Sequence, residues 1–224
     1  RKFLADSLKD VPGEDFGKHV LPELIQHDRV SAYSFSNNRI RDYRWLALPD
    51  GSRVKTLVDN TSDAEYWKDV GDLDSYWQAN MDLTGLSPNF NLYGELWPLR
   101  TYQQQYPPVK TIFNNAGENR VGSILDSIVS PGCVISGGTV ENSVLAYDVR
   151  VNSWAHVDEC VLLSHVEIGR HCKVRRAIID KHNSLPQGTE IGMDIEADRK
   201  RFHVTPGGIV VVPKRYFKPP HVES

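Results

Sequence analysis

Residues 133–163 read CVISGGTVENSVLAYDVRVNSWAHVDECVLL, and in this stretch side chains that can be buried recur at every sixth position. This spacing matches neither the two-residue period of a strand nor the 3.6-residue period of a helix. The series runs through Cys133, Thr139, Leu145, Val151, Val157 and Leu163. Mostly small residues follow four positions after each of the first five, namely Gly137, Ser143, Val149, Ala155 and Val161.

A six-residue period sustained in this way predicts a left-handed parallel β-helix, whose coils have three short flat sides. After Leu163 the phase slips by one residue. The large series then continues with Leu162, Ile168 and Val174, and its companions are Val166, Cys172 and Ile178. An antiparallel β-sandwich is the alternative, but its strands alternate with period two, which this stretch keeps for only a few residues. We therefore expect a β-helix over residues 123–218.

The first hundred residues have the pattern of a mixed α/β segment, and residues 101–122 are expected to be a linker. The run FGKHVLPELIQ (16–26) predicts a helix with one apolar face, formed by Phe16, Val20, Leu21, Leu24 and Ile25. RVSAYSF (29–35) alternates like a strand, and the turn-rich residues 36–65 are expected to form a surface loop. Near Gly71 the chain is expected to enter a helix capped by Asp69 or Asp72.

The composition limits the class of protein. With 224 residues, 40% of them hydrophobic, the chain can bury a substantial core. No apolar run approaches the ~20 residues of a membrane span, and the start lacks the apolar centre of a signal peptide, so we expect a cytoplasmic location and no membrane partner. The three cysteines are expected to be buried, reduced thiols. Residues 170–218 hold eleven Lys and Arg against five Asp and Glu, which favours a local anion site over nucleic-acid binding.

Residues 64–83, AEYWKDVGDLDSYWQANMDL, place two Trp and two Tyr among five Asp and Glu. Trp67 and Asp69 are two positions apart, so they lie on the same side of an extended segment. A ring beside a carboxylate is typical of sugar sites, because the ring covers the apolar face of a pyranose and the acid binds hydroxyl groups or a hard metal ion. The alternative is a helix cap beside an aromatic core, and the residues alone leave both open.

Four motifs occur here in the order found in one family: EYWKDVGDLDSYWQANMDL (65–83), LWPLRTY (96–102), IVSPGCVISGGTVENSVL (128–145) and GIVVV (208–212). With them the chain resembles glucose-1-phosphate adenylyltransferase, also called ADP-glucose pyrophosphorylase, of bacterial glycogen synthesis. That family begins with a Rossmann-like domain whose GGxGTRL-type loop binds the ATP phosphates, and this sequence has no such loop.

The resemblance therefore implies a carboxy-terminal portion. Residues 1–100 would be the tail of the nucleotidyltransferase domain, and residues 123–218 would be a β-helix for oligomerisation and allosteric control. The portion is predicted to be inactive alone.

The resemblance also implies roles for single residues. Asp69 matches the Asp that binds the catalytic Mg²⁺ with a second Asp from the nucleotide-binding half. Asp15, Phe16 and Trp67 match the glucose 1-phosphate site, to which Asp69 also belongs. In the implied reaction glucose 1-phosphate attacks the α-phosphorus of ATP in line and pyrophosphate leaves, without a covalent intermediate on the enzyme. The run DFG at residues 15–17 also occurs in kinases, but the other kinase motifs are absent.

Effector-binding Arg positions of the family fall on Lys181, Lys214 and Lys218. The resemblance thus implies phosphorylated metabolites or nucleotides as effectors, held without the bidentate fork of Arg. A solvated basic face is the alternative for each Lys. A homo-oligomer, expected to be a tetramer, is also implied.

Other functions remain open from the sequence. Histidines in a β-helix can serve an acyltransferase, but the sugar-site motifs before this repeat favour corner or surface roles for His156, His165 and His171. A non-catalytic regulatory or structural subunit of the same family is a second possibility. Another sugar-1-phosphate nucleotidyltransferase is a third, and the LWPLRTY run argues against it.

Overall fold

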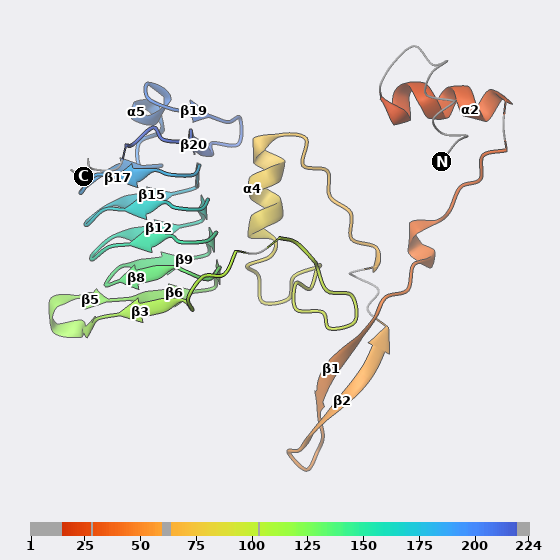
Figure 1. Cartoon of the computed structure of the whole chain (residues 1–224), viewed down its shortest axis with the longest axis horizontal. Helices are drawn as coiled ribbons and strands as arrows, with labels where there is room; N and C mark the ends of the chain where they lie inside the picture. Colours follow the sequence, from red (N-terminus) through yellow and green to blue (C-terminus); the bar gives the residue numbers. More distant parts are fainter. Residues whose placement is uncertain (1–14, 28, 60–63, 103, 219–224) are drawn as a thin grey trace. The chain divides into compact units, whose positions relative to one another are not determined.

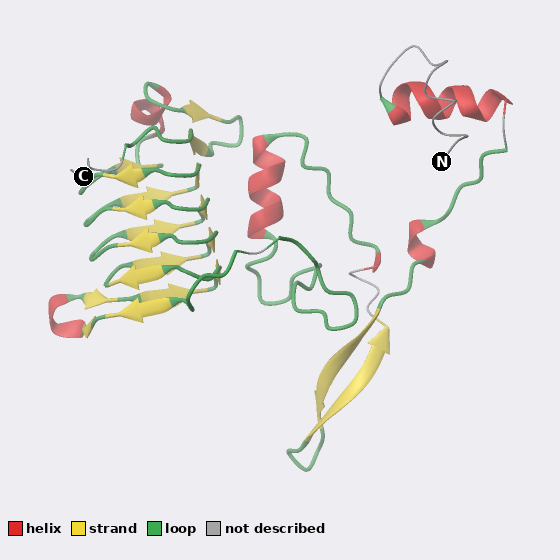
Figure 2. Cartoon of the chain, viewed as in Figure 1, coloured by secondary structure: helices red, strands yellow, loops and turns green. Residues whose placement is uncertain are grey.

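The computed structural model describes residues 15–27, 29–59, 64–102 and 104–218 (Figure 1). The chain divides into two compact units, Arg1–Arg39 and Ile40–Ser224, and each is described by itself. The first contains η1 (Phe16–Val20), α2 (Leu21–His27) and η2 (Phe35–Asn37). The second contains a β-hairpin, helix α4 (Leu73–Met81) and a solenoid of short strands (Figure 2).

The helix predicted in the first unit is present as the π-helical turn η1 followed by α2. The wide turn precedes Pro22, whose missing N–H interrupts the helical hydrogen-bond series. Val20 is buried, whereas Phe16 is 47% exposed. The strand predicted at residues 29–35 is wrong, because within the described part of the chain this exposed segment has no paired strand and ends in η2.

The loop predicted over residues 36–65 is also wrong, since it contains the antiparallel hairpin of β1 (Arg41–Ala47) and β2 (Arg53–Asp59). Its turn is closed by a hydrogen bond from the backbone N–H of Gly51 to the oxygen of Leu48 at 2.9 Å, and Gly51 has a φ of 82°, which glycine adopts without strain. Asp42 is 5% exposed and accepts a hydrogen bond from the backbone N–H of Glu95 at 3.0 Å. The hairpin is thereby fixed to the loop that follows α4.

From Lys110 onward the chain forms a parallel β-helix with three faces, which confirms the predicted fold class. Its left-handedness stays a prediction. The first face consists of β3 (Lys110–Ile112), β8 (Val134–Ser136), β11 (Arg150–Val151), β14 (Glu167–Ile168) and β17 (Ser184–Leu185). The second consists of β6 (Ser123–Leu125), β9 (Thr139–Glu141), β12 (His156–Asp158), β15 (Lys173–Arg175) and β18 (Glu190–Ile191). The third consists of β7 (Ile128–Val129), β10 (Val144–Leu145), β13 (Val161–Leu162), β16 (Ala177–Ile179) and β20 (Val210–Val212), with β19 (His203–Val204) antiparallel at its end.

Neighbouring coils are offset by 16 or 17 residues rather than by three full hexads, as the pairing of Val144 with Ile128 and with Val161 shows. The inward side chains are accordingly five or six residues apart: Ile135, Val140, Leu145, Val151, Val157, Leu162, Ile168, Val174, Ile179, Leu185 and Ile191. Two members of the predicted series, Thr139 and Leu163, are therefore only half-buried, and their neighbours Val140 and Leu162 occupy the interior. The one-residue shift that the sequence shows after Leu163 therefore recurs in every coil, as a step of five residues instead of six.

The corners turn through left-handed backbone, which Gly, Asp, Asn and His adopt more readily than other residues. One corner is formed by Gly132, Asp148, His165 and His182, whose φ angles lie between 56° and 85°. Another contains Trp154 and His171, whose rings stack at 4.8 Å. His165 and His171 thus lie at corners, as predicted.

At each end of the solenoid a segment with its own secondary structure is inserted between two strands. Between β3 and β6 the chain forms β4 (Asn114–Asn115), η3 (Ala116–Glu118) and β5 (Arg120–Val121), so the first coil begins within residues 101–122, the segment expected to be a linker. Between β18 and β20 it forms α5 (Ile195–Arg199) and β19, and Phe202 closes the interior with its ring 5.0 Å from that of Tyr216. The three cysteines lie inside as free thiols.

The third face is apolar on both sides, because its strands carry adjacent aliphatic residues, one pointing inward and one outward. The pairs are Ile128-Val129, Val144-Leu145, Val161-Leu162, Ile178-Ile179 and Val211-Val212. Helix α4 (Leu73–Met81) covers part of the outer side (Figure 1). Its Trp77 packs there with Val161, Ile178 and Ile209. Val161 and Ile178, predicted to lie inside, are buried under α4 instead.

Candidate functional site

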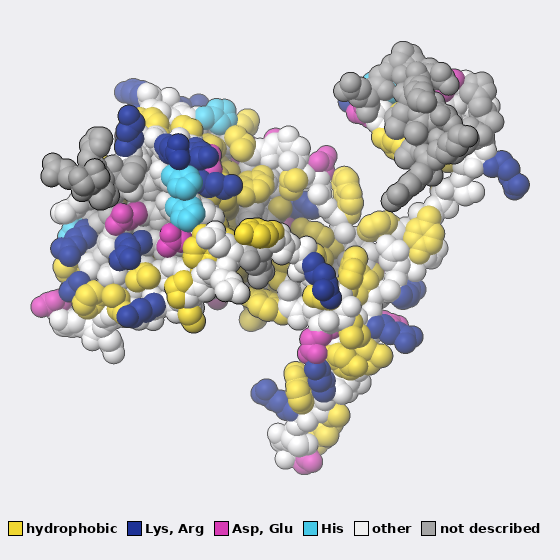
Figure 3. All heavy atoms as spheres, viewed as in Figure 1, with side chains coloured by type: hydrophobic (Ala, Val, Ile, Leu, Met, Phe, Trp, Pro, Cys, Tyr) yellow, Lys and Arg dark blue, Asp and Glu magenta, His cyan; other side chains and the backbone are white. Residues whose placement is uncertain are grey.

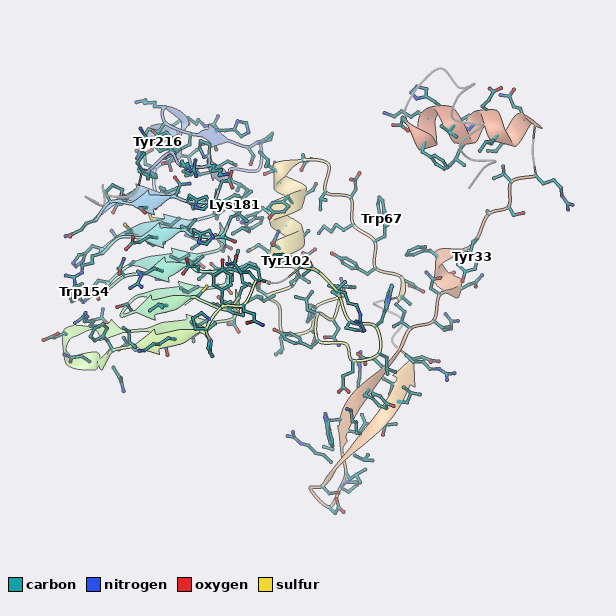
Figure 4. The ribbon with its side chains drawn as sticks, viewed as in Figure 1. Tyr33, Trp67, Tyr102, Trp154, Lys181 and Tyr216 are labelled. Carbon is teal, nitrogen blue, oxygen red and sulfur yellow. The ribbon has the colours of Figure 1, made fainter. Side chains whose placement is uncertain are left out.

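The segment that carries the predicted metal and sugar residues leads directly into α4. Asp72 is the N-cap of this helix, since its carboxylate accepts a hydrogen bond from the backbone N–H of Ser75 at 2.7 Å. Asp69, the other predicted cap, therefore has no capping role. Its carboxylate is exposed and has no hydrogen-bond or ion-pair partner among the described residues. Trp67 is 73% exposed on the same segment (Figure 4).

A pocket of about 430 Å³ opens beside Trp67. It is lined by Glu65, Tyr66, Trp67, Lys68, Asp82 and Asn89. The Tyr66 ring packs against Phe90 with the ring centroids 5.0 Å apart, which holds one wall in place. The pocket combines aromatic surface with charged groups of both signs, a composition suited to a polar ligand that has an apolar face.

Lys68 and Asp82 form an ion pair in this pocket, which the sequence analysis did not identify. Burial alone would raise the pKa of Asp82, but hydrogen bonds from Lys68 and Gln78 and the charge of Lys68 outweigh burial and lower it. Asp82 stays ionised, and its pairing fixes the Lys68 ammonium at the pocket. The sequence did indicate Lys68 as a site residue, because it stands between the predicted site residues Trp67 and Asp69.

Asp15 and Phe16 lie in the first unit and are described apart from Trp67 and Asp69. The Asp15 carboxylate caps η1 by accepting a hydrogen bond from the backbone N–H of Lys18 at 2.8 Å. This arrangement leaves the Asp15 side chain 46% exposed and places Phe16 at the start of the turn. Their role in a sugar site stays a prediction.

Asp69 fits one ligand of a magnesium site. Mg²⁺ in phosphoryl-transfer sites is bound by one or two carboxylates together with substrate phosphates. An exposed carboxylate without a partner can serve as such a ligand at no cost in broken contacts. Among the described residues no group of three or more His, Cys, Asp or Glu side chains could hold a metal ion, so these residues alone form no complete cage.

Two of the three predicted effector lysines meet at the carboxy-terminal end of the solenoid. The buried Asn183 joins their segments, because its side-chain amide donates hydrogen bonds to the backbone oxygens of Asp180 and Pro213 at 2.7 and 3.0 Å. The backbone N–H of Arg215 also donates to the oxygen of Lys181 at 3.3 Å. Lys181 and Lys214 are both exposed.

We call the group of Lys181, Lys214, Arg215 and His182 the basic corner. Desolvation lowers the pKa of His182, and the charges of His165, Arg215, Lys214 and Lys181 lower it further. Figure 3 shows His side chains beside Lys and Arg on this face of the solenoid. Lys218, the third predicted lysine, lines a separate groove of about 370 Å³ with Ser184 and Pro186.

The sequence analysis did not predict the role of Arg215 or the stacking of the two histidines. The histidines could have been found from the coil-length spacing of Asp148, His165 and His182, which places these three residues at one corner. The Nδ1 atom of His165 lies 2.9 Å from Asp148, and its ring stacks on His182 at 4.8 Å.

Two family models match the chain. The nucleotidyl transferase model matches residues 2–85, and the model of the GlmU-like C-terminal hexapeptide matches residues 107–212. The first match contains the Trp67–Asp69 segment, and the second contains the solenoid. The chain thus joins a segment similar to nucleotidyl transferases to a hexapeptide-repeat β-helix.

Whole-chain comparisons define it further. The chain is 46% identical over 202 residues to the glucose-1-phosphate adenylyltransferase of Koribacter versatilis (strain Ellin345), covering 90% of this chain and 43% of that protein. It is 48% identical over 216 residues to that of Anaeromyxobacter sp. (strain Fw109-5), covering 96% of this chain and 48% of that protein. It is therefore a homologue of the glucose-1-phosphate adenylyltransferases, as its motifs predict, and it spans about half the length of the curated relatives it matches. Among the described residues, no helix combines the length and the apolar character needed to cross a membrane.

Proposed function

We propose that this chain is the sugar-binding and regulatory portion of an enzyme that makes ADP-glucose and pyrophosphate from ATP and glucose 1-phosphate, for glycogen synthesis. The observation that carries the proposal is the Trp67–Asp69 segment, which presents a ring, an ammonium and a free carboxylate beside a pocket of about 430 Å³. The similarity to enzymes of that name supports the choice of reaction.

In the proposed mechanism these residues bind and orient rather than react. Trp67 covers the apolar face of the glucosyl ring, and Lys68, fixed by Asp82, provides positive charge near the phosphate. Asp69, with a second carboxylate from the nucleotide-binding portion, would hold Mg²⁺, which neutralises phosphate charge when bound. The phosphate oxygen of glucose 1-phosphate is thereby aligned to attack the α-phosphorus, and positioning supplies much of the rate.

The basic corner is proposed to bind phosphorylated metabolites or nucleotides that regulate the enzyme. Hydrogen bonds join the segments that carry three exposed cations, Lys181, Lys214 and Arg215. Lysines contact phosphate as point charges, so Arg215 is the group that can offer a bidentate fork. Lys181→Gln and Lys214→Gln should raise the effector concentration for half-maximal effect. Lys173→Gln is the matched control, because Lys173 pairs with Glu190 on another face at 2.9 Å. Equal effects in all three variants would contradict the assignment.

The experiment that tests the function is pyrophosphate release from ATP, Mg²⁺ and a panel of sugar 1-phosphates. It is run with this chain and with the complete product of its gene. We expect activity in the complete product alone, selective for glucose 1-phosphate. Preference for N-acetylglucosamine or mannose 1-phosphate would favour another sugar nucleotidyltransferase. Inactivity of the complete product would favour a non-catalytic subunit. Sedimentation of the complete product tests the expected homotetramer, and the cytoplasmic location stays a prediction.

A further inference from the structure

Helix α4 joins the Trp67–Asp69 segment to the solenoid through a half-buried polar contact. Thr205, which is 2% exposed, donates a hydrogen bond from its hydroxyl to Oδ1 of Asp74 in the first turn of α4. Oδ2 of Asp74 accepts a hydrogen bond from the backbone N–H of Gly207 at 3.0 Å. We call Asp74, Thr205 and Gly207 the latch.

The latch is closely fitted. The Thr205 hydroxyl also accepts a hydrogen bond from the backbone N–H of Ile209 at 3.0 Å, so it is held on both sides. A Cβ atom at Gly207 would lie 2.6 Å from Oδ1 of Asp74, closer than side chains tolerate. A side chain at position 207 would therefore displace the Asp74 carboxylate from this place.

A second contact holds the middle of α4. Nε1 of Trp77 donates a hydrogen bond to the backbone oxygen of Glu159 at 2.8 Å, and the guanidinium of Arg176 lies 4.9 Å from the centre of the Trp77 ring. Arg176 also donates a hydrogen bond to the backbone oxygen of Gly207 at 3.2 Å. One arginine thus joins the latch to the Trp77 contact.

The strands that hold α4 continue to the basic corner. β16 begins directly after Arg176 and ends two residues before Lys181, and β20 begins directly after Ile209 and ends two residues before Lys214. The two strands pair in parallel, Ala177 with Val210 and Ile179 with Val212. A three-residue strand spans about 10 Å, so one rigid strand pair contacts α4 at its start and carries the basic corner at its end.

We propose that the latch residues Asp74, Thr205 and Gly207 are positioning residues. They fix the first turn of α4, and with it Trp67 and Asp69, to the strand pair that ends at the basic corner. The latch does not touch the substrate, and it acts through the placement of the segment ahead of α4. The effect of the latch on catalysis rests on the proposed function, whereas the attachment of Trp67 and Asp69 to the solenoid through α4 does not.

The first test is amide hydrogen exchange of this chain. Thr205→Val removes the hydroxyl at nearly constant volume and should speed exchange in residues 67–81 at least tenfold, because the first turn of α4 is then free to open. Thr205→Ser keeps the hydroxyl and should restore protection to within about threefold of the parent. Thr189→Val is the control at the same end of the solenoid, since the Thr189 hydroxyl bonds to the oxygen of Pro186 instead.

A double-mutant cycle tests the contact directly. Gly207→Ala should expose residues 67–81 to exchange as Thr205→Val does. In an Asp74→Ala background the same change should add little, because the clashing carboxylate is gone. Additive effects of the two substitutions, or unchanged exchange in Thr205→Val, would overturn the latch.

The second test is steady-state kinetics of the complete gene product. If the latch positions Asp69, Thr205→Val lowers kcat at least tenfold while the KM values change less than threefold, and Thr205→Ser restores kcat. Faster exchange with unchanged kcat in an active enzyme would overturn the positioning role. A complete product without any activity would refute the proposed function, and the exchange result for residues 67–71 would still decide whether the latch holds them.

Discussion

Replacing Leu162 and Leu163 by alanine, one at a time, tests the coil register of the solenoid. Leu162 is fully buried, whereas Leu163 is half-buried on the outer side among the residues that α4 covers. Truncation removes three carbon atoms at either position. At about 0.8 kcal/mol for each buried CH₂ group, Leu162→Ala loses roughly 2.4 kcal/mol of transfer free energy, and the cavity raises the total to about 3 kcal/mol. Leu163→Ala loses about half of the transfer term and leaves no closed cavity, so about 1 kcal/mol is expected.

Urea unfolding followed by far-ultraviolet circular dichroism measures this difference. With an m-value of about 2 kcal/mol/M, the midpoint should fall by about 1.5 M for Leu162→Ala and by about 0.5 M for Leu163→Ala, with m unchanged. A strict six-residue series from Cys133 places Leu163 inside and reverses the order. A midpoint for Leu163→Ala equal to or below that of Leu162→Ala would therefore refute the five-and-six-residue register.

Three further outcomes are expected. Burial would raise the pKa of Asp42, but hydrogen bonds from the N–H groups of Tyr43, Glu95 and Leu96 outweigh burial and lower it. The stability that these bonds give is complete above the unfolded-state pKa and is lost as the pH falls through the folded-state pKa. The protection of β1 and β2 against hydrogen exchange, relative to intrinsic rates, should therefore fall below about pH 4, and Asp42→Asn should abolish this pH dependence. No thiol should react with Ellman's reagent at pH 8 before denaturation, because all three cysteines are buried and burial raises the pKa of Cys160 to about 12; reaction of a native thiol would contradict the interior placement. In the complete gene product Asp69→Ala should lower turnover by at least ~10²-fold with the fold intact, whereas Asp72→Ala should cost about 1 kcal/mol of stability as a lost helix cap; near-normal turnover of Asp69→Ala would exclude its metal role.

The solenoid was predictable because its signal is local and repeated. Six-residue spacing identified the fold class, but strict counting put Thr139 and Leu163 inside. Adjacent aliphatic residues such as Val161-Leu162 mark a face that is apolar on both sides, and they would have shown that something covers it. The hairpin could not be predicted because turn residues are frequent throughout residues 36–65, so the turn that ends at Gly51 does not stand out from them.

The site was predictable only where neighbouring residues define it. Trp67 and Asp69 stand two positions apart, so their shared side follows from the backbone. The hydrogen bond from Trp77 to Glu159 and the latch between Asp74 and Thr205 join residues far apart in the chain. In the sequence, nothing distinguishes Asp74 from the other acidic residues at the start of this helix. No local pattern specifies such contacts, because they depend on which coil α4 meets.

Each coil of the solenoid takes 16 or 17 residues, so the effect of an insertion or deletion depends on whether it adds or removes a whole coil. Deleting 17 residues between equivalent corners removes one circuit, keeps every later face in phase and shifts the following coils by about 4.8 Å along the axis. Deleting six residues instead turns everything downstream by one face. Helix α4 would then meet a charged surface in place of Val161 and Ile178, and the strand pair of β16 and β20 would turn away from α4 together with the basic corner that it carries. Relatives and engineered variants that differ by whole coils can keep the same junction, whereas those that differ by single hexads must rebuild it.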